Sequence, residues 1–551
     1  MGDKKTHYLN MNLTDMQRDG NELFNFDRDL NENFEILDNT FGNLPQGIPP
    51  TNCTGLTIRK ENGKAYLSWS DSKDTVIDGY TLCSWQKTII VMKEGEYPAN
   101  TADGEIVAIN YERNKYANSE LEIDLPDAEA DYCFKAFPVS LNGVTNLDNH
   151  NRFGAIVYGF YIDKQNSNPV GRVHYIEANE NFKKAYMDYS SGSFNYGDWE
   201  DVWFIKQLRP VMINKAGEVV EELDKNDYTK KIDGTASSVS TTSGELNCMI
   251  EFPQVWIKYV ETVSRSYVYI SNQKMDDDYH AWNFYNHNGE LQDVKYISAY
   301  EGTIISNVMR SLSGQKVSTV TTATAEINAA VANGAGWYTR IYSDWQMLIA
   351  LAVLISGSTN TQAAFGNGNQ NFVEQNDNNK NRNVNLINNG TLDKKGLFWG
   401  SNDTTNHIAV KLFGIENPWG NAWDRIAGFI NDRGRLLVKM TYSQVDGSTV
   451  TGYNQTASGY IDTGLTIGTN SQAYISKTKA TPYGLIPVEF AGSSSTNEAD
   501  GCWNNTTQLS YALVGSCCRD GLLVGLFALH LYVAPSISYW HNGSALSYIA
   551  S

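Results

Sequence analysis

The C-terminal residues 515–543 constrain the fold of this 551-residue chain more than any other segment. Small and apolar residues recur there as a framework, whereas the positions between them follow no hydropathy pattern. A folding segment normally repeats polar residues on its wet face and apolar residues on its dry face. The pattern therefore predicts a scaffold that presents dissimilar side chains. The framework comprises Gly515, Gly525, Phe527, Leu529, Leu531, Pro535 and Trp540.

Eleven positions between the framework residues carry a mixture of basic, acidic, aromatic and aliphatic side chains. These positions are Ser516, Cys517, Arg519, Asp520, Leu523, His530, Tyr532, Val533, Ile537, Tyr539 and His541. We expect them to face solvent and to bind a ligand, because they alternate with framework residues that suit a core. The scaffold of this site would consist of Trp423, Gly525, Phe527, Leu529 and Trp540. An ordinary glycine-rich strand pair with variable polar positions is the alternative.

This segment resembles the variable region of proteins that a retroelement diversifies. In that family, template adenines are copied with errors, so asparagine codons of the AAC type become any codon ending in C. Such codons specify the residues seen between the framework positions, but not Lys, Glu, Gln, Met or Trp. Between residues 515 and 543 only Trp540, a framework position, belongs to that excluded set. The resemblance implies a variable region at about residues 513–545.

Charge and composition exclude several classes of protein. The chain is 41% hydrophobic, enough for packed cores, and its net charge is −19. This charge argues against nucleic acid or an anionic membrane as the main partner, since both require a basic face. The seven cysteines lack the spacing of a disulfide framework or a zinc site. The longest apolar run, residues 348–355, is too short to span a bilayer, and no signal peptide opens the chain.

The N-terminal residues 1–47 are expected to form a helical attachment or oligomerisation segment. Five apolar residues spaced three or four apart would share one face of a helix over residues 26–41, namely Phe26, Leu30, Phe34, Leu37 and Phe41. So short a helix must bury this face, either around a homotrimer axis or on the next domain. The phrase at residues 30–35 is similar to the start of many phage tail-fibre and baseplate proteins.

Residues 48–160 read as a β-sandwich, because short alternating runs are separated by recurring turn clusters without a helical period. The runs at residues 67–69 and 132–138 resemble those of fibronectin type III-like domains in tail proteins. The resemblance implies an Ig-like spacer or attachment domain, since the fold alone does not imply a function.

Residues 161–551 are expected to form one large α+β domain. A first helix is predicted over residues 324–333, ending at Gly334. A second helix would begin at Ser343 with a capping box to Gln346 and extend to Ile355. Because it is apolar nearly all round, we expect it at the centre of the domain. A long polar loop region follows at residues 357–407.

The order of motifs in this domain resembles that of C-type lectin domains of the formylglycine-generating-enzyme type. The chain carries a tyrosine–glutamate strand at residues 295–302, the two helices, a Gly-Asn-x-Trp motif at residues 420–423, and then the variable segment. Asp424 stands where the family has Glu, and Arg425 replaces the aromatic residue that follows. The expected fold class is therefore mostly β and multidomain, with a short N-terminal helix, a fibronectin III-like sandwich and a C-type lectin-like domain.

Catalysis and cofactors are not expected. The same family includes oxidases that use a cysteine pair with copper, but only Cys502, Cys517 and Cys518 lie near this C-terminus. Adjacent strand residues do not aim two thiolates at one metal ion. The acidic run at residues 276–278 lacks the spacing of a calcium loop. The histidines show neither triad nor metal-ligand spacing, so we expect no metal site.

The sequence thus favours a receptor-binding protein of a phage tail that presents hypervariable residues to a host-surface protein or glycan. Its other expected partners are tail proteins bound through the N-terminal segment and two further copies in a homotrimer. It would be assembled in the host cytoplasm and end in the virion, at the tail tip or fibre. A structural tail or baseplate subunit without ligand display is the alternative, followed by a bacterial surface-displayed binder.

Overall fold

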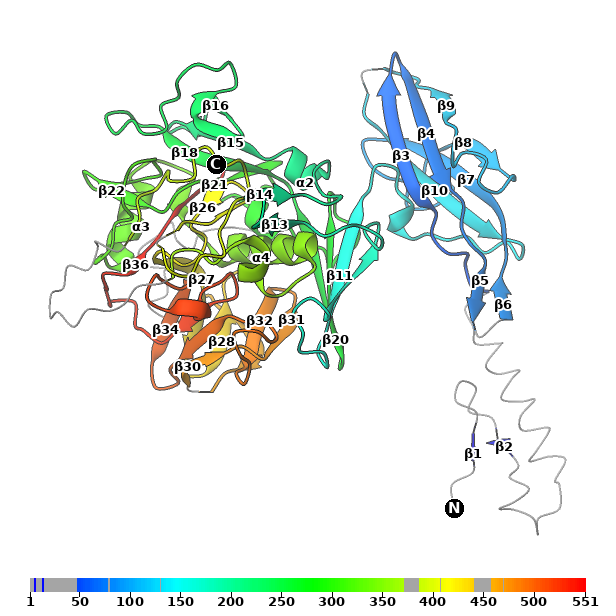
Figure 1. Cartoon of the computed structure of the whole chain (residues 1–551). Helices are drawn as coiled ribbons and strands as arrows, with labels where there is room; N and C mark the ends of the chain where they lie inside the picture. Colours follow the sequence, from blue (N-terminus) through cyan, green and yellow to red (C-terminus); the bar gives the residue numbers. More distant parts are fainter. Residues whose placement is uncertain are drawn as a thin grey trace, which may run out of the picture. The chain divides into compact units, whose positions relative to one another are not determined.

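The computed structural model divides the chain into two compact units, residues 1–155 and residues 156–551 (Figure 1). Strands make up 39% and helices 9%, which confirms the mostly β fold class. The helix expected over residues 26–41 lies outside the described residues. The structure describes residues 4–5, 12–13, 47–77, 80–128, 130–370, 386–406, 408–440, 457–468 and 470–551.

The first unit contains two three-stranded antiparallel sheets that share one core. The first sheet has the order β3 (Thr54–Glu61), β4 (Lys64–Ser70) and β9 (Leu121–Asp124). The second has the order β10 (Tyr132–Ser140), β7 (Trp85–Glu94) and β8 (Glu105–Asn110). Two short pairs complete the unit, β1 (Lys4–Lys5) with β2 (Asn12–Leu13) and β5 (Thr75–Ile77) with β6 (Tyr80–Cys83).

Alternation of side chains along the strands builds this core. Leu67 and Trp69 of β4 point inward and meet Ile90 of β7 and Phe134 of β10 in one buried cluster. The indole Nε1 of Trp69 donates to the Asp71 carboxylate at 2.8 Å, which satisfies its only polar atom. The expected two-layered arrangement of short strands is therefore present over residues 54–140.

Three larger sheets organise the second unit. The first has the order β12 (Val173–Glu177), β11 (Val157–Asp163), β20 (Arg265–Ser271) and β19 (Trp256–Glu261). The second has the order β17 (Asp227–Lys231), β16 (Val219–Asp224), β15 (Arg209–Ile213), β18 (Asn247–Pro253), β21 (Val294–Ser298), β37 (Leu546–Tyr548) and β24 (Trp337–Thr339). Because β11 pairs with β20, residues 157–160 belong to this unit, and the division falls before the predicted boundary at residue 160.

The third sheet contains eight strands and holds most of the C-terminal region. Its order is β29 (Ile461–Thr466), β28 (Arg435–Val438), β27 (Trp423–Asp432), β34 (Leu509–Val514), β35 (Leu529–Leu531), β33 (Gly501–Asn504) and β30 (Asn470–Tyr474), with β36 (Asn542–Gly543) also on β27. Four hairpin pairs surround the sheets: β13 (Tyr186–Asp188) with β14 (Ser193–Asn195), β22 (Thr303–Ile305) with β23 (Val308–Arg310), β25 (Lys411–Leu412) with β26 (Ile415–Glu416), and β31 (Lys477–Thr481) with β32 (Gly484–Glu489).

The central helix of this unit is α4 (Tyr342–Ser356), and all fifteen of its residues are buried, as its apolar sequence predicts. The predicted capping box is wrong. Ile341 is the N-cap, because its extended backbone forms a parallel bridge to Ala427, and Asp344 accepts from the Ile341 N–H at 3.4 Å. Ser343 therefore lies inside the first turn of the helix.

The other helices are shorter, and α3 (Ala323–Val331) corresponds to the helix predicted over residues 324–333. Thr322 caps it by accepting from the Ala325 N–H at 3.3 Å. The remaining two are α2 (Trp203–Lys206) and α5 (Thr361–Phe365). None of the helices in the described part of the chain combines the length and apolarity that a membrane span requires.

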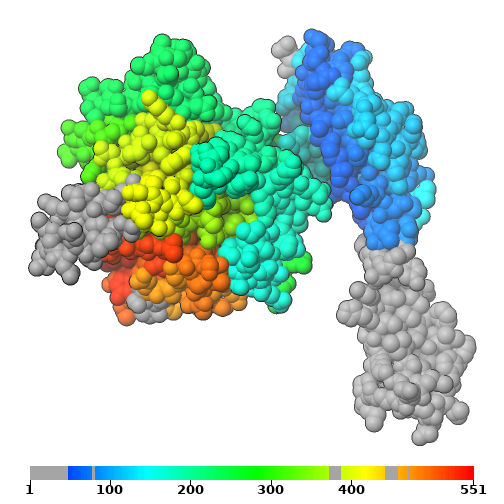
Figure 2. Space-filling model, in the orientation of Figure 1, coloured from blue at the N-terminus to red at the C-terminus, as the bar shows by residue number. Residues whose placement is uncertain are grey.

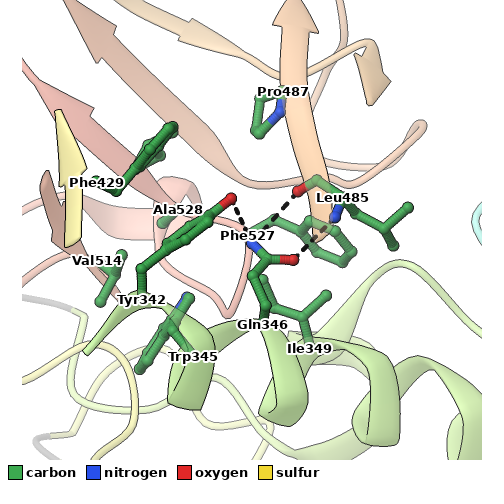
Figure 3. A pocket seen from close by; sticks show the side chains of 11 residues that line it. Tyr342, Trp345, Gln346, Ile349, Phe429, Leu485, Pro487, Val514, Phe527 and Ala528 are labelled. Carbon is green, nitrogen blue, oxygen red and sulfur yellow. Dashed lines mark hydrogen bonds between the residues drawn. The ribbon is translucent and has the colours of Figure 1, made fainter. Parts of the chain in front are cut away.

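Helix α4 packs tightly against the strands around it (Figure 3). Gln346 Oε1 accepts from the Leu485 N–H at 2.9 Å, while its Nε2 donates to the Tyr342 hydroxyl at 2.9 Å. Phe527 of the C-terminal segment closes the same space. The remaining cavity is about 10 Å³, room for a single water at most.

A buried ion pair joins α4 to the seven-stranded sheet. The Lys295 ammonium of β21 lies 2.6 Å from the Asp344 carboxylate, and both side chains are fully buried. The ammonium also donates to the Tyr338 hydroxyl at 2.7 Å, while Asp344 accepts from Ser547 at 2.8 Å and from Asn283 at 3.1 Å. Burial lowers the pKa of Lys295, and the carboxylate opposes that shift.

Replacing Asp344→Asn should lower the free energy of unfolding by about 3–5 kcal/mol, because it leaves a buried ammonium without a counter-charge. Urea unfolding followed by tryptophan fluorescence measures the change. The matched control is Asp201→Asn, which breaks an exposed pair with Lys206 and should cost at most about 1 kcal/mol. Equal losses in both variants would contradict a structural role for the buried pair.

Candidate functional site

The Gly-Asn-x-Trp motif at residues 420–423 holds both ends of the segment 515–543. At the end of the segment, β36 runs parallel to the start of β27, with Trp423 beside Asn542. Three backbone hydrogen bonds add to this pairing: the Gly420 N–H to the Gly515 carbonyl (3.1 Å), the Cys518 N–H to the Asn421 carbonyl (3.1 Å), and the Trp423 N–H to the His541 carbonyl (2.8 Å). The segment is therefore a loop closed on one rigid strand.

Glu301 links this motif to the tyrosine–glutamate strand. Its carboxylate accepts from the Asn421 side-chain amide at 2.5 Å and from the Ala422 N–H at 3.2 Å. Burial raises the pKa of Glu301 to about 8. Two motifs that lie more than a hundred residues apart in the sequence thus meet at the base of the loop.

Along β35 the predicted alternation is present. Leu529 and Leu531 are buried, whereas His530 between them is partly exposed and Tyr532 is 40% exposed. The His530 ring packs edge-to-face on Trp423, with centroids 5.3 Å apart. The framework residues of this strand therefore face the core.

Gly525 is required by the close approach of Asp500. Its φ is +145°, and a Cβ at this position would lie 2.1 Å from Asp500 Oδ1. The buried Asp500 carboxylate accepts from the Phe527 N–H at 2.8 Å, and burial raises its pKa. The framework positions Gly525 and Phe527 thus fix the turn that enters β35.

The expectation that all eleven variable positions face solvent is wrong at five of them. The buried positions are Ser516, Cys517, Leu523, Val533 and His541. Only three residues of the segment, Leu529–Leu531, form an extended strand before β36, so strict alternation does not apply elsewhere. In the loops before and after β35, Cys517 and Val533 pack in one buried cluster with residues of β27 and β34.

The thiols in the first loop illustrate this packing. Cys517 Sγ lies 3.1 Å from an Asp520 carboxylate oxygen, and Ser516 Oγ donates to the same oxygen at 2.8 Å. Burial raises the pKa of Cys517, and raises that of Cys518 to about 12. These buried side chains hold the conformation of the loop and are not part of its exposed surface. All seven cysteines of the chain are free thiols.

The remaining six positions reach solvent to different degrees. Arg519, Tyr532 and Tyr539 are exposed, the last at 45%, while Asp520, His530 and Ile537 are partly exposed. Part of this C-terminal region, coloured red, reaches the surface of the second unit in Figure 2. The framework residue Trp540 is only partly buried and packs on Val317, which corrects its expected place in the core.

Sequence reasoning missed two exposed positions, Leu522 at 46% and Ser536. Each follows a residue that favours a turn, Gly521 or Pro535. We define the display surface as Arg519, Leu522, Tyr532, Ser536 and Tyr539.

Arg425 and Asp424, which depart from the lectin-like pattern, form buried ion pairs. Arg425 pairs with Glu326 of α3, and Asp424 pairs with Arg340. Arg425 also donates to the Ile537 carbonyl at 3.2 Å, which holds the second loop of the segment. Arg425 therefore connects the second loop of the segment to α3.

Two imidazoles lie beneath the display surface. Each Nδ1 of His530 and His541 is buried and has no hydrogen-bond partner among the described residues. Burial lowers the pKa of both rings to about 3, and the nearby positive charge of Arg519 acts in the same direction. Both rings are therefore neutral at pH 7. Within the described residues, no three or more His, Cys, Asp or Glu side chains are grouped to hold a metal ion.

Comparison with known protein-family models gives no match to this chain. A search of curated proteins likewise finds no similar sequence.

The Gly525→Ala substitution should lower the free energy of unfolding by more than 3 kcal/mol, on the order of a buried clash added to backbone strain. Gly521→Ala is the matched control. Gly521 also has a positive φ, +59°, but no atom lies within 4 Å of its Cβ position. It should cost only about 1–2 kcal/mol for the left-handed backbone. If urea unfolding shows a similar loss of unfolding free energy in both variants, the Asp500 side chain moves to make room for the added methyl group.

Stability should fall as pH decreases from about 6.5 towards 3. In that interval the unfolded chain protonates His530 and His541 near their ordinary pKa of 6.5, whereas the folded chain keeps them neutral. Their contribution is complete above pH 6.5. The double variant His530→Asn/His541→Asn should show a smaller decrease in urea midpoint between pH 7 and pH 4. An unchanged decrease would contradict the lowered pKa of the two rings.

Proposed function

We propose that this chain is the receptor-binding protein of a phage tail, with a C-type lectin-like domain at residues 161–551 that presents the display surface to a host-surface protein or glycan. The single observation that supports this function is the closed loop 515–543. Its two ends are held by the 420–423 motif while Tyr532 and Tyr539 remain exposed. In the same proposal, residues 48–160 are a fibronectin type III-like spacer.

The chemistry of the display surface suits recognition of a partner molecule. Tyrosine and arginine are enriched at binding hot spots, because they offer large contact area together with hydrogen-bonding groups. Tyr539 stacks on His541 with ring centroids 5.4 Å apart, and Tyr532 lies 6.1 Å from the His530 ring. The stacking on His541 limits the motion of Tyr539, which lowers the entropy lost on binding.

A structural tail subunit is the second candidate function. It is favoured by the burial of Ser516, Cys517 and His541, which a surface evolved only for display would not require. A homotrimer formed through residues 26–41, contacts of that segment with other tail proteins, and a place in the virion remain predictions of both candidates. Avidity from three copies would strengthen a weak single site.

Replacing Arg519, Tyr532 and Tyr539 together by Ser should abolish adsorption to host cells and change stability by at most about 0.5 kcal/mol per site. Adsorption of the fluorescent full chain to a panel of bacterial strains, read by flow cytometry, measures binding. The matched control replaces three exposed residues outside the segment, Tyr186, Ile232 and Val263, by Ser. Equal adsorption of both triple variants to a strain that the parent chain binds would refute ligand display.

A further inference from the structure

A groove of about 760 Å³ lies beside the display surface. Its walls are the β22–β23 hairpin and one face of α3, and its floor is the extended segment 316–321. Figure 1 shows α3, β22 and β36 in the same part of the second unit. The volume falls within the range of about 300–1,000 Å³ that is typical of small-molecule sites.

The segment 316–321 connects the groove to the closed loop. The Val320 N–H donates to the Tyr539 carbonyl at 3.0 Å. The Val317 side chain lies so close to Gly543 that a Cβ added to this glycine would be 2.5 Å from it. Val320 has a φ of +61°, a conformation that a β-branched residue rarely adopts. Backbone strain of this kind is typical of ligand-binding segments.

The lining is polar and nearly uncharged. Six of its ten residues are polar, and Lys316 is the one ionisable residue among the ten. Asn307 and Asn328 offer side-chain amides, which both donate and accept. Glu326 on α3 turns away from the groove, because its carboxylate pairs with Arg425.

The hydroxyls of the floor add the complementary hydrogen-bonding groups. Ser318 Oγ accepts from the Ile304 N–H at 2.8 Å, so its proton stays available to a ligand. The Thr321 hydroxyl donates to Glu326, so its oxygen can still accept. Between these groups, Ala325 of α3 presents an exposed methyl group.

The polar side chains and the single cation of the lining determine which class of ligand the groove can bind. An extended peptide would need unpaired backbone groups, yet the Ser318 and Val320 N–H groups already bind Gly302 and Tyr539. An anion would require more than one cation. A sugar matches the site, because its hydroxyls both donate and accept while its ring presents a C–H face that can pack on Ala325.

We propose that this groove binds an uncharged saccharide, with Asn307, Asn328, Ser318 and Thr321 bonding its hydroxyls and α3 covering one face of the ring. The site goes beyond the proposed display function and does not depend on it, because none of its lining residues belongs to residues 515–543. The groove would bind the same saccharide when the residues of the display surface change.

Saturation-transfer NMR on the full chain tests this site, with the methyl glycosides of glucose, galactose, N-acetylglucosamine and glucuronic acid as probes. We expect transfer to at least one uncharged glycoside. Two variants should each weaken binding by about tenfold or more. Ala325→Trp fills the groove, and Asn328→Asp removes the amide that donates a hydrogen bond to the sugar. Asn328→Asp keeps the side-chain size and covers the case in which the tryptophan variant does not fold.

The control on the same helix is Ala332→Trp, since Ala332 is exposed at the end of α3 and does not line the groove. It should bind the glycoside like the parent chain. No transfer to any uncharged glycoside, transfer to the glucuronide alone, or equal transfer in the parent, Ala325→Trp and Asn328→Asp would overturn the proposal. Tyr532→Ala separates the two sites, because only the display function predicts that it lowers adsorption to cells.

Discussion

The fully buried pair of Lys295 and Asp344 fixes how the second unit is assembled. A charge at this depth is stable only with its counter-charge, so β21 and α4 can adopt no other relative position without a large penalty. The carboxylate also accepts from Ser547 of β37, which places the last strand of the chain between β21 and β24. This arrangement also positions the C-terminal end of the closed loop, because β36, which forms that end, is only two residues from β37.

A second set of buried polar side chains connects this arrangement to the loop. Arg425 pairs with Glu326 on α3 and donates to the Ile537 carbonyl, while Glu301 binds the Asn421 amide and the Ala422 N–H. These contacts use the backbone of the loop more than its side chains. A loop held in this way can change its exposed residues without losing its anchors, which is the property that a display surface requires.

The sequence predicted the parts of this architecture that depend on local periodicity. The apolar run of α4 indicated a central helix, and the alternation across Leu529–Leu531 indicated which residues face the core. The start of α4 and the burial of Cys517 and His541 depend instead on partners far away in the chain, such as Ala427 and β27. No local pattern encodes such partners. Nor did the sequence motifs indicate the hydrogen bond between Glu301 and Asn421, which joins two of them.

The division between buried and exposed positions limits where variation in the loop can alter binding. A new side chain at Ser516 or His541 must fit a closed space, and overpacking of such a space costs about 1–3 kcal/mol. Arg519, Tyr532 and Tyr539 are exposed, so a new side chain at these positions has room on its solvent side. Diversity at the buried positions would therefore act through the shape of the loop, and through the Tyr539 carbonyl it would reach Val320 and the groove beside it. The display surface and the groove thus share no residue, and the hydrogen bond between the Val320 N–H and the Tyr539 carbonyl joins the two segments that carry them.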